Sequence, residues 1–202
     1  LATYPLAALC LHTEFSPLPG LTFRESLYNG VASDRINRQF RFCPRSDGMF
    51  NIGSLSYHIG EEDRHHGYYA VGYALGSSPS ETSADKTFNY ALWTLIEQPL
   101  LHIGESHLGA MWQGGTSPAS RSTCRHYWGA GLIWSNIPPR MTQVGLVVNR
   151  ALYADGRETD VELTGSFPVC NHFTLQPAVH CINTNGNYTA AAQLRAILEF
   201  GN

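Results

Sequence analysis

The acidic residues and histidines of this chain are the first candidates for chemistry. The segment GEEDRHHG (60–67) gathers glutamates, an aspartate and histidines, which are residue types that ligate divalent metals. Adjacent histidines in a turn seldom converge on one ion, so we interpret this segment as a solvated turn. The sequence therefore predicts no metal site and no cofactor.

A pair of acids occurs at a spacing of two, in Asp160 and Glu162, and Glu199 follows in a later segment. Two carboxylates that flank a glycosidic bond can hydrolyse it, which makes a glycan-cleaving enzyme one hypothesis. The same spacing arises when acids line the polar side of a strand, so we expect no enzyme. The segment GESHLG (104–109) lacks the G-x-S-x-G spacing of a nucleophile elbow and leaves that expectation unchanged.

The elements that would position these residues are strands. Helical periodicity is almost absent, whereas apolar and polar residues alternate in runs of about eight to twelve residues, the length of tilted barrel strands. We predict one all-β domain over 1–202, belonging to an antiparallel up-and-down transmembrane β-barrel. The predicted strands, about eleven, lie near residues 4–12, 21–29, 49–59, 67–76, 88–99, 107–115, 126–135, 142–150, 158–167, 173–182 and 190–200.

The two sides of the predicted strands differ. In the last run, Leu194 and Leu198 face one way, whereas Arg195 and Glu199 face the other. A cationic side chain that faces lipid at the midplane costs about 2–4 kcal/mol, but a water-filled lumen accepts charge. The pattern therefore indicates lipid on one side and water on the other. It also fits the amphipathic strands of a soluble β-barrel or sandwich that binds a ligand, which is the alternative.

The connections between these runs are predicted to alternate in length. The segments INTNGNYT and ALYADGRE are longer than PVCNH and NIPPRM, and VASDRINRQFRFCPRSDG is the longest. Alternate connections of an up-and-down sheet lie at the same end. One end should therefore carry tight turns and the other long loops, as in outer-membrane barrels.

Composition and charge exclude several classes of protein. Charged residues make up 14% of the chain and the formal net charge is −3, so no nucleic-acid partner is expected. No run of about eighteen apolar residues predicts a membrane helix, and no signal peptide is visible. The abrupt start in LATYPLAALCL favours a mature form or a fragment. The cysteines are odd in number and lack CxxC spacing, which leaves one disulfide and free thiols both open.

Several strings occur in an order that resembles a known family. They are YPLAALCLH, GYYAVGYAL, LGAMWQGGTSP, YWGAGLIWSNIPPR, QVGLVVNRAL, ETDVELTGSF, FTLQPAVHCINTNG and AAQLRAILEF. Together they resemble the carbohydrate-selective porins of the bacterial outer membrane, the OprB family, over most of the chain. No single string is specific, so the resemblance depends on their order and spacing.

The resemblance implies an outer-membrane channel for the passive diffusion of carbohydrates or other small hydrophilic solutes. The family's barrel has sixteen strands, so this chain would correspond to its C-terminal portion, as a fragment or a remodelled barrel. An open edge in lipid leaves backbone groups unsatisfied, so an additional barrel chain or a homo-oligomer is an expected partner. Membrane lipid, lipopolysaccharide and small sugars are the others. A partial barrel that serves as the structural partner of another outer-membrane chain is a further alternative.

The faces and the resemblance together predict the side chains that line the pore or contact sugar. These candidates are Tyr68, Trp93, Glu97, Gln113, Gln143, Asn149, Asp160, Glu162, Gln176, His180, Arg195 and Glu199. The family often has arginine where Gln113 falls, so its sugar preference is not carried over.

The longest connection carries four arginines, Arg35, Arg38, Arg41 and Arg45. They are candidates for binding lipopolysaccharide phosphates or for constricting the pore from a loop that folds inward. An exposed loop without a ligand is the alternative.

Overall fold

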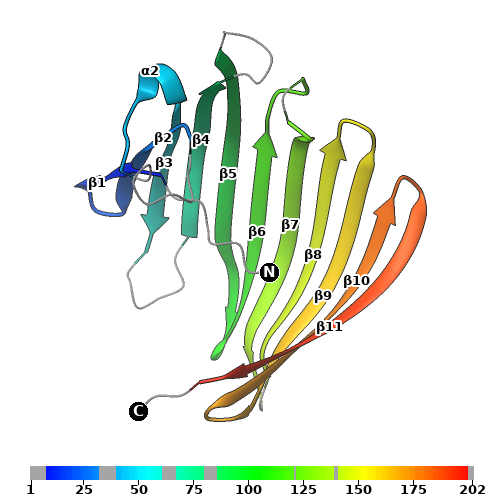
Figure 1. Cartoon of the computed structure of the whole chain (residues 1–202). Helices are drawn as coiled ribbons and strands as arrows, with labels where there is room; N and C mark the ends of the chain where they lie inside the picture. The colour runs from blue at the N-terminus through cyan, green and yellow to red at the C-terminus, as the bar shows by residue number, and fades with distance from the viewer. Residues whose placement is uncertain are drawn as a thin grey trace.

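The chain forms one large β-sheet. The computed structural model describes residues 8–31, 40–60, 67–79, 86–120, 122–138 and 141–199. In these ranges eleven antiparallel strands follow one another in the order β1 to β11, so that each strand pairs with its neighbours in sequence (Figure 1). The predicted all-β, up-and-down fold is therefore confirmed. No helix in the described ranges is long and apolar enough to cross a membrane.

The strands fill most of the described chain. They are β1 (Cys10–Leu18), β2 (Leu21–Asn29), β3 (Met49–Ile59), β4 (Gly67–Pro79), β5 (Lys86–Ile103), β6 (Ser106–Thr116), β7 (Cys124–Ile137), β8 (Met141–Tyr153), β9 (Arg157–Cys170), β10 (Phe173–Thr184) and β11 (Asn187–Leu198). A short helix, α2 (Pro44–Asp47), lies in the long connection between β2 and β3.

The first strand lies elsewhere than predicted. The sequence predicts a strand near 4–12 and a connection over EFSPLPG (14–20), whereas β1 continues to Leu18. Residues 1–7 lie outside the described residues. Prolines favour a turn in this segment, but β1 is an edge of the described sheet, where Pro17 is not required to donate a ladder hydrogen bond. Pairing with β2 is accordingly irregular between Phe15 and Leu18.

The predicted alternation of connection lengths is wrong for the C-terminal strands. The segment INTNGNYT contains only a two-residue turn, because β10 and β11 pair as far as Thr184 and Asn187. The turn residues Asn185 and Gly186 both have positive φ angles, 55° and 96°, which suit a tight hairpin turn. Between β8 and β9, ALYADGRE likewise narrows to residues 154–156. The longest connection, residues 30–48, lies where the sequence predicts it.

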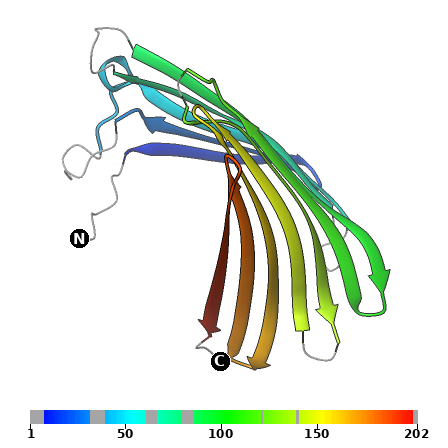
Figure 2. The same ribbon diagram turned by 90° about the vertical axis from the view of Figure 1, so that its right-hand side faces the viewer.

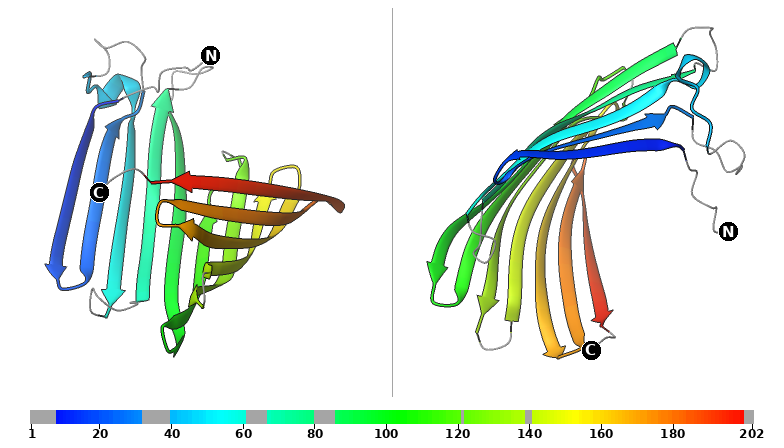
Figure 3. Two further views of the ribbon diagram at one scale, coloured as in Figure 1. Left: turned by 90° about the horizontal axis from the view of Figure 1, so that it is seen from below. Right: turned by 90° about the vertical axis from the view of Figure 1, so that its left-hand side faces the viewer.

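The sheet is a single curved layer. Its strands change direction progressively, so that β9–β11 lie across the direction of β1–β4 when the sheet is seen from below (Figures 2 and 3). β1 and β11 are its two edges, and the described residues show no pairing between them. Within this part of the chain, the side chains therefore have no second sheet to pack against.

One side of the sheet, which we call the apolar face, exposes a continuous apolar surface. Cross-strand pairing places Leu132, Leu146, Leu163 and Val179 in one row, and these side chains are 48%, 48%, 54% and 55% exposed. The buried hydrophobic residues of the described ranges are only two alanines. The apolar face therefore covers no protein core. A water-soluble sandwich would bury such rows against a second sheet.

The alternation predicted from the sequence is confirmed in the C-terminal strands. Leu194 and Leu198 lie on the apolar face and are 68% and 60% exposed. Arg195 pairs with Gln176 on the opposite side, and Glu162 pairs there with His180. We call this second side the polar face.

Candidate functional site on the polar face

The polar face brings the predicted pore-lining residues onto one surface. Strand register places Tyr68, Trp93, Glu97, Gln113, Gln143, Asn149, Asp160, Glu162, Gln176, His180 and Arg195 on this side. Glu199 follows the end of β11. Tyr68, Glu97, Glu162 and His180 even lie in one cross-strand row from β4 to β10. Contact of these side chains with a solute stays a prediction.

Trp93 forms an aromatic platform on the polar face. Its ring covers Gly72 of β4, because a Cβ atom at that glycine would lie 2.3 Å from the ring atoms Cε2 and Cζ2. On its other side Trp93 pairs with Gly115 of β6, where a Cβ atom would meet only the carbonyl oxygen of Leu92, at 3.5 Å. The indole therefore leans toward β4, and only glycine at position 72 permits this position of the ring.

Three polar side chains form a connected network across β6, β7 and β8. The Gln113 Nε2 amide donates to the Tyr127 hydroxyl at 2.5 Å, and the Tyr127 hydroxyl donates to Asn149 Oδ1 at 2.8 Å. Gly129 of β7 lies between Gln113 and Asn149, and a Cβ atom at Gly129 would be 2.4 Å from Asn149 Oδ1. The network thus holds two predicted pore-lining residues in fixed orientations. Tyr127 is not among the residues predicted from the sequence, although its position in β7 places it on the same side as Gly129, facing the polar face.

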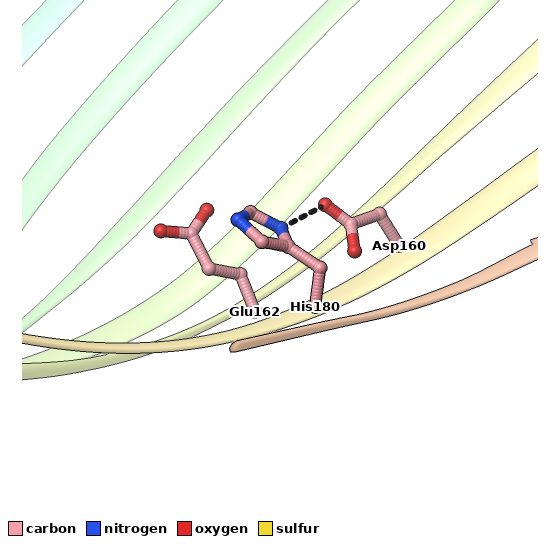
Figure 4. Close-up of side chains that lie close together, drawn as sticks. All are labelled: Asp160, Glu162 and His180. Atoms are coloured by element: carbon pink, nitrogen blue, oxygen red, sulfur yellow. Dashed lines mark hydrogen bonds and ion pairs between the residues drawn. The ribbon is translucent and has the colours of Figure 1, made fainter. Parts of the chain in front are cut away.

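Two carboxylates and an imidazole converge where β9 meets β10. His180 Nδ1 lies 3.1 Å from Asp160 Oδ2, and Glu162 pairs with His180 across the strands. The ligand atoms of all three side chains lie within 4.8 Å of one another. Figure 4 shows the imidazole between the two carboxylates. Each of the three residues is a pore-lining candidate by sequence, but the sequence does not predict that they meet.

A shallow depression lies on the polar face of β8, β9 and β10. Its volume is about 220 Å³, and it is lined by the polar residues Gln143, Thr164, Ser166 and Gln176 together with Ile133, Val147, Gly145 and Gly165. Amide and hydroxyl groups can both donate and accept hydrogen bonds. Gln143 and Gln176, two of the predicted sugar-contact residues, are thus brought to one site.

One acid within the described strands, which is not among the residues predicted from the sequence, lies on the apolar face. Glu25 of β2 pairs with Gly53 of β3, and its carboxylate accepts hydrogen bonds from the Tyr73 hydroxyl, at 3.0 and 3.1 Å, and from the Asn51 amide. A Cβ atom at Gly53 would approach Glu25 to 2.4 Å and Tyr73 to 2.5 Å. The alternation in LTFRESLYN indicates this position, because it places Glu25 on the same side of the strand as phenylalanine and leucine.

Two of the four loop arginines fall within the described residues. Arg41 forms an ion pair with Asp47 at 3.2 Å and donates to Ser46 at 2.9 Å. Arg45 belongs to α2 and is exposed. Arg35 and Arg38 lie outside the described residues, so binding of lipopolysaccharide and constriction of the pore both stay predictions.

The five cysteines are free thiols. Of the two possibilities that the sequence left open, the structure therefore has the one without a disulfide.

No family model matches the sequence, and no curated protein matches it. The structure, in contrast, is similar to that of OprB from Pseudomonas putida at high pH, with a TM-score of 0.72 over 96% of this chain. The chain has the fold of a porin barrel wall. The sequence identity is 13%, and the match covers 58% of the OprB chain, so this chain spans little more than half of that porin. The resemblance noted in the sequence is thus supported at the level of the fold.

Proposed function

We propose that the chain forms part of the wall of an outer-membrane channel through which small hydrophilic solutes diffuse passively. The observation that carries the proposal is the division of one continuous sheet into an exposed apolar face and a polar face. The row of Leu132, Leu146, Leu163 and Val179 has no protein to cover it among the described residues, and lipid would do so. The opposite side would then contact water in the lumen.

Carbohydrates are the solutes that we propose. A sugar offers hydroxyl groups along its ring edge and an apolar ring face. The depression beside Gln143 and Gln176 presents amide and hydroxyl groups that can bond to the sugar hydroxyls. The indole of Trp93 presents an apolar surface to the ring face of the sugar. Fixed charge is mixed along this face, with Glu97 and Arg195 among the charged residues. Such a wall favours neutral polar solutes without a strong preference for either sign of charge.

A channel requires the sheet to close. Backbone groups at the β1 and β11 edges would be unsatisfied in lipid, at a cost of several kcal/mol for each group. We propose that further strands, from the same protein or from another chain, pair with these edges. The match covers 58% of the OprB chain, so that chain extends well beyond the part matched here. Lipid, lipopolysaccharide and small sugars are the proposed partners, and no catalysis is proposed.

Liposome swelling tests the proposal. The protein would be purified in detergent as its complete, natively assembled form and reconstituted into liposomes. We expect swelling in isosmotic monosaccharide that is faster than in protein-free liposomes, and slower swelling as the sugar becomes larger. Absence of sugar flux from fully assembled protein would contradict the channel. Recovery of folded protein in detergent-free buffer would instead support a soluble ligand-binding protein, and glycan cleavage lost on Glu162→Gln would support an enzyme.

A further inference from the structure

We propose that Asp160, Glu162 and His180 form a binding site for one divalent transition-metal ion of the zinc type. The site is built by strand register. Glu162 of β9 and His180 of β10 are direct cross-strand partners. Asp160 lies two residues before Glu162 and therefore on the same face of β9. The imidazole consequently stands between the two carboxylates (Figure 4).

The distances suit a single ion. Two ligand atoms bound at about 2.0–2.1 Å to one tetrahedral zinc ion are about 3.3–3.4 Å apart. His180 Nδ1 and Asp160 Oδ2 are already 3.1 Å apart, so an ion can take the place of the direct contact between them. One ligand atom from each of the three side chains lies within 4.8 Å of the others, and a rotation of the Glu162 side chain would bring its carboxylate to the ion. Water would occupy the fourth position, as it does in zinc sites with three protein ligands.

The carboxylate oxygens are incompletely paired without an ion. Asp160 Oδ1 is inaccessible to solvent and has no hydrogen-bond partner among the described residues. The side chains of Asp160 and His180 are 21% and 20% exposed, so neither is a freely solvated surface group. A buried carboxylate oxygen without a partner costs free energy, and binding of a cation would remove that cost.

The surroundings allow an ion to enter. On the β11 side His180 pairs with Ala191, and along β10 it lies between Ala178 and Ile182 on the same face, so two of these three neighbours are small. Within the described ranges, the ion-pair partner of Asp160 is His180, and no lysine or arginine contacts the cluster. Two carboxylates and one neutral imidazole offer oxygen and nitrogen donors, which suit zinc better than the oxygen-binding calcium and magnesium.

Zinc binding would make the net charge of the polar face less negative. A divalent ion offsets the two negative charges of Asp160 and Glu162. If the polar face lines a channel, which rests on the proposed function, zinc should shift the ion selectivity of the channel toward anions.

Isothermal titration with ZnCl₂ tests the site in the complete protein, folded in detergent. We expect wild-type protein to bind one more zinc ion than Asp160→Asn or His180→Gln, or to bind it about tenfold or more tightly. Glu158→Gln is the matched control. It removes an acid from the same face of β9, where Glu158 contacts Thr184 rather than the cluster, and it should leave the zinc isotherm unchanged. Calcium should not produce the difference between wild-type and variant proteins.

Other zinc-binding groups are common to all the variants, because the free thiols and the remaining histidines are untouched. Thermal unfolding in detergent establishes that each variant is folded. Identical zinc isotherms for folded wild-type, Asp160→Asn and His180→Gln proteins would overturn the site. The binding measurement does not depend on conduction. If the protein conducts sugar but the zinc isotherms are identical, the metal site is contradicted and the channel is not. If the protein binds zinc at this site but does not conduct sugar, the channel is contradicted and the metal site is not.

Discussion

Replacing Gly72 by alanine tests the position of Trp93 on the polar face. The new Cβ atom would lie 2.3 Å from the indole and 2.7 Å from the carbonyl oxygen of Gly53, whereas ordinary contacts begin near 3.4 Å. The indole must therefore move by at least 3.4 − 2.3 = 1.1 Å, and the backbone contact with Gly53 hinders any relief by the strand itself. Forcing an extra methyl group into such a contact typically costs about 1–3 kcal/mol.

The companion variant Gly115→Ala isolates that cost. Gly115 pairs with Trp93 from the other side, and its Cβ atom would meet only a carbonyl oxygen at 3.5 Å. Replacing glycine by alanine within a strand gains about 0.5–1 kcal/mol from reduced backbone entropy in the unfolded chain, and this gain is common to both variants. Gly72→Ala should thus be less stable than Gly115→Ala by about 1–3 kcal/mol.

Reversible urea unfolding of the detergent-folded protein, followed by tryptophan fluorescence, measures the difference. The folded-state emission should also change in Gly72→Ala, because the environment of Trp93 changes, and should stay unchanged in Gly115→Ala. Equal free energies of unfolding for the two variants would refute the placement of the indole over Gly72. A Gly72→Ala protein more stable than Gly115→Ala would refute it too.

Two further predictions concern the apolar face. Leu146→Arg should lower the free energy of unfolding in lipid vesicles by about 2–4 kcal/mol, whereas Gln143→Arg, on the polar face of the same strand, should change it by less than about 0.5 kcal/mol. Equal losses would argue against lipid on the apolar face. Tyr73→Phe should destabilise the protein by about 1–3 kcal/mol, because the Glu25 carboxylate loses a hydrogen bond in apolar surroundings. Combining it with Glu25→Leu should recover part of that loss, and strictly additive energies in a double-mutant cycle would contradict the coupling.

Local alternation made much of the fold predictable. Successive residues of a strand point to opposite sides, so the face of each residue in β8 and β9 follows directly from the sequence. Leu146 and Leu163 lie on the apolar face, whereas Glu162, the residue before Leu163, lies on the polar face. Turn chemistry was less well predicted. The Asn185–Gly186 turn is so tight that polar residues assigned to a loop belong to β10 and β11.

Contacts between strands were beyond the sequence. Whether His180 lies opposite Glu162 depends on the turn between β9 and β10 and on the register shift at Phe173 and Thr174, neither of which local alternation reveals. The same holds for Glu25, whose side of β2 can be read from the sequence, but whose hydrogen bond to Tyr73 crosses β3. Pairing of polar groups therefore required the three-dimensional structure.

The sequential strand order has a consequence for folding kinetics. Each strand finds its partner in the adjacent hairpin, and apart from residues 30–48 the chain closes only short loops, so the entropy lost at each step is small. The sheet can thus grow one hairpin at a time, in either direction. In such growth a register error affects all later strands. A one-residue slip at a turn would exchange the two faces of every strand added after it. If lipid covers the apolar face, as proposed, Arg195 would then face hydrocarbon and Leu194 water, and the cost of burying that charge would disfavour the misaligned sheet.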